Sequence, residues 1–349
     1  MRFGIAGTGR TVSIADSHTR GILADGRGSV AAVFNRNVST SERWTEKNGV
    51  RARVCADYEE LLSLCDAVII CTPNATHFEY ASAAIKAGKH VLCEKPMSVG
   101  LQEAYKLAKL AEGSPVVCRV GLVYRFSAGV NALKTLVRER IGRVYSIDAR
   151  MGGSRLADPG LPMEWRMYRA LSGSGALGDF GSHLLDIAAY ACETRFDAAA
   201  AVTATSIKQR RAGDVRVPVE TDDVAALICS GAGGVGCLSM SRVGMDKTEL
   251  LVVGEGGMAR LELGRTAELT FYAKEPQGGY TGAIEAIPLA QEDVFEAGFR
   301  RQISDFIDAA EHRPSVGADF ADGLYIERLL DIARCAEPKA AGNNMEVQT

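Results

Sequence analysis

One short stretch decides how this chain folds: His90-Val91-Leu92-Cys93-Glu94-Lys95-Pro96. The apolar run at residues 90–93 is typical of a buried strand, and the polar residues after it mark the strand's carboxyl end. Parallel α/β sheets bind ligands in the crevice outside the carboxyl ends of their strands, so we expect Lys95 to face a ligand. Pro96 fixes the backbone directly after it. The alternative, a surface lysine in a turn, fits the flanking motifs less well.

A glycine turn near the start of the chain predicts a phosphate-binding site. Gly7-Thr8-Gly9 follows an apolar run at residues 3–6 and precedes a helical pattern, and we expect Arg10 to belong to the same site. In the G-x-G-x-x-G fingerprint, the first glycine makes a tight turn and the second lets the backbone approach a pyrophosphate. Val12 stands in the third glycine's place, so we expect looser or shifted packing there. The turn predicts dinucleotide binding.

Strands and helices alternate over the first third of the chain. Strand-like runs occur at residues 3–6, 30–34, 67–71, 90–93 and 116–120, and helical patterns occur from Gly9 to about residue 23 and at 58–64, 76–87 and 101–111. Such alternation predicts βαβ units and a parallel sheet. We therefore expect an α/β dinucleotide-binding domain over residues 1–120.

The pattern changes after about residue 120. Strand-like runs occur at residues 144–150, 201–208, 224–230, 234–242, 250–253, 258–263 and 269–273, and helical patterns close the chain at 295–311 and 320–336. The runs lack intervening helices of any length, which predicts a mostly antiparallel sheet. We therefore expect a second, α+β domain over residues 121–349.

The residues after the second strand bear on the choice of cofactor. An acidic residue there would bind the ribose 2′-hydroxyl of NAD, but the chain has Asn35-Arg36-Asn37 instead. No carboxylate repels a 2′-phosphate, and Arg36 can pair with one while stacking on adenine. This favours NADP. In the alternative interpretation, Asn35 bonds the 2′-hydroxyl, Arg36 lies on the adenine face, and NAD is used.

Another polar segment follows the third predicted strand of the crevice. Thr72-Pro73-Asn74 comes at a strand's carboxyl end and is expected to line the cofactor site with Glu94, Lys95 and Pro96. His77 opens the next helix. A histidine at that position is more often structural than catalytic, but we keep it as a candidate for the cofactor site.

A histidine and an aspartate four residues apart suggest acid–base chemistry. Asp179 and His183 would share one helix face, with Asp186 one step further along. Histidine exchanges protons near neutral pH, and a nearby carboxylate can orient its ring. Gly178 and Gly181 weaken this helix, which suggests close packing by a cofactor or substrate. The alternative is a buried polar pair that holds the helix to the sheet.

Composition excludes several classes of function. The formal charge of −3 provides no basic surface for nucleic acid or anionic membrane, and no apolar run is long enough to span a bilayer. The first residues enter a strand at once, so we expect no signal peptide. The nine cysteines are scattered without a C-x-x-C pair. They indicate small buried hydrophobes in a reducing cytoplasm and no metal site.

These motifs together resemble the Gfo/Idh/MocA oxidoreductases, which include inositol and sugar dehydrogenases. The resemblance covers nearly the whole chain. It is carried by Gly7-Thr8-Gly9, the blocks at residues 71–77 and 87–96, the block at 175–186, and the closing patterns at 305–309 and 322–324. It implies an N-terminal Rossmann domain and a C-terminal domain with an open, mainly antiparallel sheet that often forms a dimer or tetramer interface. A cis Lys95–Pro96 bond is also implied.

The resemblance further implies a reaction. Lys95 would contact the nicotinamide ribose and the reacting hydroxyl of a sugar, inositol or other polyol, and Asp179 and His183 would face this substrate, with His183 as the proton acceptor or donor. Val12 and Asn35 depart from the pattern of many NAD-using members. Two alternatives stay open: a glycoside-cleaving enzyme whose cofactor is not consumed, and a binding protein that senses the dinucleotide.

Substrate contacts are less well marked in the sequence. The candidates are Tyr124, Arg125, Arg155, Trp165, Arg166 and Tyr168. Aromatic rings offer a flat face to a sugar's C–H surface, and arginine offers forked donors to hydroxyls or a carboxylate. Loop packing and surface ion pairs explain these residues equally well.

Overall fold

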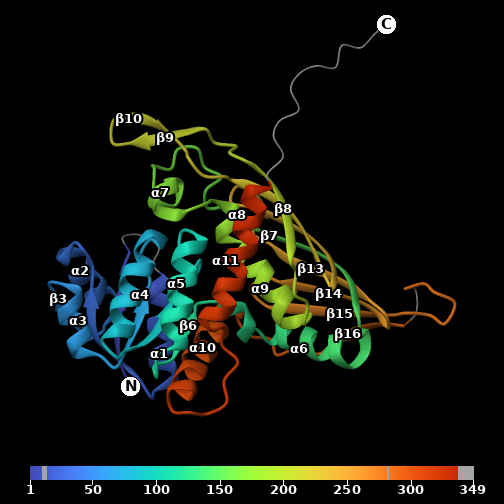
Figure 1. Cartoon of the computed structure of the whole chain (residues 1–349), viewed down its shortest axis with the longest axis horizontal. Helices are drawn as coiled ribbons and strands as arrows, with labels where there is room; N and C mark the ends of the chain where they lie inside the picture. Colours follow the sequence, from blue (N-terminus) through green and yellow to red (C-terminus); the bar gives the residue numbers. More distant parts are fainter. Residues whose placement is uncertain (10–13, 281–282, 337–349) are drawn as a thin grey trace, which may run out of the picture.

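The computed structural model describes residues 1–9, 14–280 and 283–336, and it contains two large β-sheets that lie side by side (Figure 1). One sheet has six strands and the other has eight, and a two-stranded hairpin adds to them. The expectations for Arg10 and Val12 concern residues outside the described part of the chain.

The six-stranded sheet confirms the predicted Rossmann domain. Its strands run in the order β3-β2-β1-β4-β5-β6, and every pairing is parallel. The strand order reverses between β1 and β4, and Rossmann domains bind dinucleotides in the crevice at this point. The strands are β1 (Arg2–Ala6), β2 (Ser29–Phe34), β3 (Arg53–Cys55), β4 (Ala67–Ile70), β5 (His90–Cys93) and β6 (Cys118–Val120).

Helices cover both faces of this sheet, which is why its strands are nearly wholly apolar. The helices are α1 (Ile14–Asp25), α2 (Val38–Asn48), α3 (Tyr58–Leu64), α4 (His77–Lys86) and α5 (Leu101–Glu112). The analysis of the sequence missed α2 and β3. Helix α2 is mostly polar and buries only Thr40, Ser41 and Trp44, so it lacks an apolar period. Strand β3 has three residues.

The second sheet is mixed rather than purely antiparallel. Its order is β16-β15-β14-β13-β7-β12-β11-β8, and within the described part of this sheet only the β12–β7 pairing is parallel. Its strands are β7 (Val144–Gly152), β8 (Ala198–Ala204), β11 (Val224–Gly231), β12 (Gly234–Ser241), β13 (Thr248–Gly254), β14 (Gly257–Leu263), β15 (Ala267–Ala273) and β16 (Ile284–Ile287). The open, mainly antiparallel sheet is thus confirmed.

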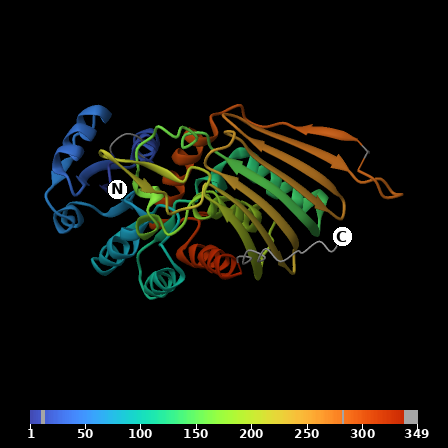
Figure 2. The same cartoon turned by 90° about the horizontal axis from the view of Figure 1, so that it is seen from above.

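Helices cover one face of this sheet and leave the other bare (Figure 2). Helix α6 (Ala128–Leu136) packs on β14 and β15, and α9 (Gly181–Ala191) packs on β7 and β12. The expectation that no helix of any length separates the strands was therefore wrong for α9. Strand β8 also ends at Ala204, not at residue 208, because the chain turns there into the hairpin of β9 (Gln209–Ala212) and β10 (Val215–Pro218).

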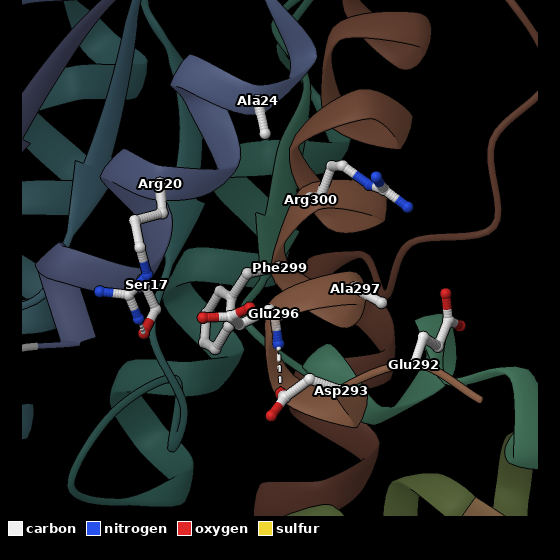
Figure 3. Close-up of a pocket in the computed structure, with 9 residues that line it drawn as sticks. All are labelled: Ser17, Arg20, Ala24, Glu292, Asp293, Glu296, Ala297, Phe299 and Arg300. Carbon is white, nitrogen blue, oxygen red and sulfur yellow. Dashed lines mark hydrogen bonds between the residues drawn. The ribbon is translucent and has the colours of Figure 1, made fainter. Parts of the chain in front are cut away.

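The last two helices return to the Rossmann domain. Helix α10 (Val294–Ala310) packs against α1, and α11 (Phe320–Cys335) lies between α5 and β8 (Figure 1). Figure 3 shows the α1–α10 seam, with Phe299 pointing from α10 toward α1. A division at residue 120 thus follows the order of the chain, whereas α10 and α11 join the two sheets in space. None of the helices in residues 1–9, 14–280 and 283–336 is long and apolar enough to cross a membrane.

The expectation that the cysteines are buried holds for most of them. Six are buried and Cys71 is partly buried, but Cys237 and Cys335 are exposed. Cys237 points outward because successive side chains of β12 alternate between the two faces of the sheet.

We expect Gly21→Ala to destabilise the protein, because Gly21 sets the approach of α1 to α10. A Cβ atom there would lie 2.9 Å from the carbonyl oxygen of Phe299 and 3.1 Å from Cγ1 of Ile303. Overpacking costs about 1–3 kcal/mol, which exceeds the gain of about 1 kcal/mol in helix propensity. Urea unfolding should show a net loss of stability. Leu23→Ala, on the exposed side of α1, should change stability by less than about 0.5 kcal/mol. A Gly21→Ala protein as stable as wild type would contradict this packing.

Candidate active site

The glycine turn lies where the first strand meets the carboxyl end of β4. Gly7 has a φ of +93°, which favours glycine. A Cβ atom on Gly7 would lie 2.7 Å from the carbonyl carbon of Cys71 and from the amide nitrogen of Thr72. Glycine is therefore needed both for the turn and for close contact with the next strand. The turn, the strand switch and the start of α1 at Ile14 fit a dinucleotide's pyrophosphate.

The residues after β2 border this turn. The side-chain amide of Asn35 donates to Oγ1 of Thr8 at 3.2 Å, which fixes the amide beside the glycines. Arg36 is exposed and has no ion pair within the described part of the chain. Its guanidinium is thus free to reach a ligand over the ends of β1 and β2.

His77 ties two strand ends together. Its ring is fully buried, with Nδ1 2.8 Å from the carbonyl oxygen of Pro96 and Nε2 2.9 Å from that of Thr72. Burial lowers the pKa of His77. Both ring nitrogens are engaged by the backbone, so we assign His77 to holding the segments around Thr72 and Pro96. His77 also lines the cavity described below, and its contact with a cofactor stays a prediction.

Lys95 crosses from the Rossmann domain to the second domain. It follows β5, and its Nζ donates to the Asp179 carboxylate oxygen Oδ1 at 2.5 Å and to the Asp179 carbonyl oxygen at 2.8 Å. The Lys95 side chain is 15% exposed and that of Asp179 is 29% exposed, so the pair borders a cavity. The Lys95–Pro96 peptide bond is cis, as the resemblance implies.

The helix that was expected to carry Asp179 and His183 is interrupted between them. Helix α8 (Ala176–Asp179) ends at Asp179, and α9 begins at Gly181. In a continuous helix the carbonyl of Asp179 would accept from the N–H of His183. The interruption frees that carbonyl, and Lys95 uses it. The break in the helix therefore lets one aspartate hold the lysine with both its backbone and its side chain.

Burial and nearby charges together set the protonation states of Asp179 and His183. Burial alone would raise the pKa of the Asp179 carboxyl, but the charges of Lys95 and Arg166 and the hydrogen bond from Lys95 hold it well below its usual range. Burial lowers the pKa of His183 well below that of ordinary histidine, and the Lys95 charge adds to this effect while Asp179 opposes it. At neutral pH the site therefore contains a carboxylate and a neutral imidazole.

His183 lies beside Tyr124 and not in direct hydrogen-bond contact with Asp179. The two rings meet edge to face with centroids 4.9 Å apart, and both residues are 8% exposed. Burial raises the pKa of Tyr124 to about 12. Nδ1 of His183 is buried and has no hydrogen-bond partner among the described residues. His183 is not among the residues that line the cavity around Lys95, so its contact with a substrate stays a prediction.

A cavity of about 130 Å³ connects the cofactor end with the second domain. Lys95 and Asp179 line it, together with Cys71, Thr72, Asn74, Trp165, Arg166, Ser172, Ser174 and Arg242. The amide of Asn74 donates to the carbonyl of Ser172 at 2.9 Å, so the two walls are directly bonded. Residues predicted to bind the cofactor therefore line the same cavity as Trp165 and Arg166, which were predicted to contact the substrate.

Arg166 has the features of a substrate-binding side chain. It stacks on the ring of Trp165 at 4.4 Å from the ring centroid, and its nearest carboxylate oxygen, on Glu164, is 3.6 Å away. Arg155 instead pairs with Glu164 through both of its terminal nitrogens. Tyr168 does not line this cavity in the described structure.

Arg125 is engaged elsewhere. Its guanidinium binds Asp186 through Nε and Nη2 and Asp322 through Nη1, and the residue is 6% exposed. Burial raises the pKa of Asp186 to about 6 although Arg125 opposes the shift. This network joins the 3₁₀ turn at Val123–Phe126, α9 and α11. We therefore infer that Arg125 stabilises the elements that surround the site and does not bind substrate.

Sequence reasoning missed Arg242 and misjudged the glycines. Arg242 lines the cavity at the end of β12, is 3% exposed, and donates to the carbonyl of Arg166 at 3.1 Å. A charged residue at the end of an alternating strand was the available signal. Gly178 and Gly181 face the protein itself: a Cβ on Gly178 would clash with Ser174, whereas one on Gly181 would meet Leu330 at an ordinary 3.6 Å.

Comparison with known proteins identifies the family. A profile described as an oxidoreductase family with an NAD-binding Rossmann fold matches residues 1–122, and the profile of the GFO/IDH/MocA C-terminal domain matches residues 130–260. The chain belongs to the GFO/IDH/MocA family of oxidoreductases. The expected fold and the expected class of enzyme, an oxidoreductase with a nicotinamide cofactor, are thereby confirmed.

Individual relatives extend the likeness over most of the chain. Levoglucosan dehydrogenase of Pseudarthrobacter phenanthrenivorans is 29% identical over 302 residues, which cover 76% of each protein. Inositol 2-dehydrogenase of Paracoccus denitrificans is 28% identical and covers 100% of this chain and 97% of its own. A solved structure of levoglucosan dehydrogenase with NADH and levoglucosan has a TM-score of 0.85 at 25% identity, covering 96% of both chains.

Proposed function

We propose that this protein transfers hydride between a nicotinamide cofactor and a secondary alcohol or ketone of a sugar, inositol or related polyol. The observation that carries the proposal is the Lys95–Asp179 pair, which stands at the carboxyl end of β5 and lines a polar cavity. The relatives named above, which act on levoglucosan and inositol by their names, support the substrate class.

Lys95, His183 and Asp179 have separate roles in the proposed reaction. The bound nicotinamide supplies the hydride acceptor or donor. Lys95 donates to the substrate oxygen and stabilises the negative charge that develops there. Neutral His183 takes the hydroxyl proton during oxidation and returns it during reduction. Asp179, as a carboxylate, keeps Lys95 in place and holds a neighbouring substrate hydroxyl.

His183→Ala should lose about 10²–10⁴-fold in kcat while the dissociation constant of the reduced cofactor stays unchanged, because only the proton acceptor is removed. Stopped-flow turnover and cofactor fluorescence measure the two quantities. His312→Asn, which replaces an exposed histidine, is the matched control and should retain activity. Turnover of His183→Ala near that of wild type would contradict the assignment.

The pH dependence should show the lowered pKa of His183. The imidazole is protonated only below the usual histidine pKa of about 6.5, so kcat/KM for alcohol oxidation should not fall as the pH drops from 8 to about 6.5. One result would contradict a neutral His183: an acid limb with its midpoint at or above about pH 6.5 in the wild-type profile that is absent from the profile of His183→Ala.

We infer that NADP is the preferred cofactor. Two features support this: residues 35–37 contain no carboxylate, and the exposed Arg36 guanidinium is free of ion pairs in the part of the chain described above. NAD is the alternative, since Asn35 lies beside Thr8 where it can bond a ribose hydroxyl. The levoglucosan dehydrogenase structure contains NADH.

Fluorescence titration with NADPH and NADH decides between the two cofactors. We expect tighter NADPH binding in wild type, and Arg36→Ala should weaken NADPH by about 10–100-fold, the value of a charge-assisted hydrogen bond, without weakening NADH equally. Arg51→Ala, which removes another exposed arginine of the same domain, should change neither. Tighter NADH binding by wild type would favour the interpretation in which Asn35 reads a 2′-hydroxyl.

We also propose that the bare face of the eight-stranded sheet forms a homodimer or homotetramer interface. Apolar side chains on neighbouring strands support this: Val202 on β8 is 58% exposed, Ile228 on β11 60% and Val235 on β12 45%. Contiguous exposed apolar surface of this kind is typical of protein interfaces.

Ile228→Glu should therefore dissociate the oligomer, because it places a charge in the apolar face. Light scattering after size-exclusion chromatography measures the mass. Val215→Glu, at an equally exposed position on the β9–β10 hairpin, should leave the mass unchanged. A wild-type monomer, or an Ile228→Glu protein of wild-type mass, would contradict the proposed interface.

A further inference from the structure

The reaction proposed above leaves one buried histidine unexplained. His18 lies on α1 and is fully buried, and its Nε2 is 2.8 Å from Oε1 of Glu94. Its Nδ1 has no hydrogen-bond partner among the residues that the structure describes. Its ring meets Phe299 of α10 edge to face, with centroids 4.9 Å apart. A histidine that served only to fill space would not need a buried carboxylate as its single polar partner.

Glu94 is the residue before the proposed catalytic lysine. It is 8% exposed and lines the cavity described above. Its second oxygen, Oε2, accepts from the backbone N–H of Lys95 at 3.2 Å. A buried carboxylate is costly unless it is paired and hydrogen-bonded, and these two donors supply that.

The carboxylate of Glu94 also lies close to Gly121. A Cβ atom on Gly121 would lie 2.8 Å from Oε1 of Glu94, so a larger residue there would require this carboxylate to shift. The backbone of Gly121 donates to the carbonyl of Cys93 at 2.7 Å, which fixes this neighbour at the end of β5. Contacts with His18, Gly121 and the Lys95 amide therefore restrict the position of the carboxylate.

A continuous series of contacts runs from the seam in Figure 3 to the active site. Phe299 packs on His18, His18 bonds Glu94, Glu94 bonds the Lys95 backbone, and the Lys95 ammonium bonds Asp179. Helix α1, which follows the glycine turn in the chain, is thereby linked to the end of β5. The series of contacts therefore holds α1 and Lys95 to each other.

We propose that His18 is a positioning residue for the reaction: by holding Glu94 it fixes the backbone of Lys95, and so sets the position of the lysine ammonium relative to the cofactor and to Asp179. His18 touches neither substrate nor cofactor in this scheme. The inference rests on the proposed role of Lys95.

Three substitutions at residue 18 test the proposal in the full-length protein. His18→Leu fills the space without a donor, His18→Gln keeps a donor at a similar reach, and His18→Asn keeps a donor that is too short for Glu94. Misplacing a catalytic group by about 1 Å can cost 10²-fold, so we expect His18→Leu and His18→Asn to lose about 10–100-fold in kcat. The KM for substrate should change by less than about threefold, and His18→Gln should recover most of kcat.

A matched control separates positioning from a general loss of stability. His90 lies at the opposite end of β5, and its ring also meets a phenylalanine of α10, Phe306, with centroids 6.5 Å apart. His90→Leu should lower the melting temperature and leave kcat unchanged. Wild-type kcat in His18→Leu would overturn the proposal. So would equal activity of His18→Gln and His18→Asn, a comparison that remains valid if the leucine variant does not fold.

A readout without turnover keeps this test independent of the proposed function. In a crystal structure of His18→Gln the Lys95 ammonium should remain on Asp179, and in His18→Asn it should be displaced. An unmoved ammonium in His18→Asn would overturn the positioning role. Failure of wild type to oxidise any polyol with either cofactor would instead overturn the proposed function and leave this structural comparison standing.

Discussion

Among the residues that the structure describes, Asp179 alone holds the Lys95 ammonium, through a carboxylate oxygen at 2.5 Å and a backbone carbonyl oxygen at 2.8 Å. This contact joins the end of β5 to the end of α8, and so joins the two domains at the point where chemistry is proposed to occur. A partly buried ion pair is weak evidence for stability, because desolvation offsets much of the attraction. The pair is better explained by the need to hold a cation beside a substrate oxygen, with the carboxylate kept ionised by its surroundings.

Two other contacts keep the two domains in a fixed relation around this pair. Asn74 bonds the carbonyl of Ser172 across the cavity. Helix α10 packs against α1, where Gly21 leaves room for the backbone of Phe299. The support comes from distant parts of the chain, since α10 follows α1 by more than two hundred residues. The cavity is therefore a consequence of how both domains pack, and not of either domain alone.

The sequence predicts the parts of this site that depend on local pattern. Gly7, Lys95 and the strands before them follow from apolar runs and turn residues, and the Rossmann fold follows from their alternation. The break at Phe180 was not predicted, because it lies within a helical pattern and the lysine that bonds the freed carbonyl is distant in the sequence. The ion pairs of Arg125, which was expected to bind substrate, and the place of Arg242 in the site were not predicted either, because the sequence does not show that Asp186 and Asp223 are their partners. Local pattern predicted the elements, whereas the partners of buried charges required the tertiary structure.

Steady-state turnover of Lys95→Met tests the central claim most directly. Methionine keeps much of the volume of the side chain and removes the ammonium, so kcat for oxidation of a polyol substrate, measured at saturating cofactor, should fall by about 10³-fold, as expected for loss of the charge that stabilises the developing alkoxide. A Lys95→Met enzyme within about tenfold of wild-type kcat would contradict the account.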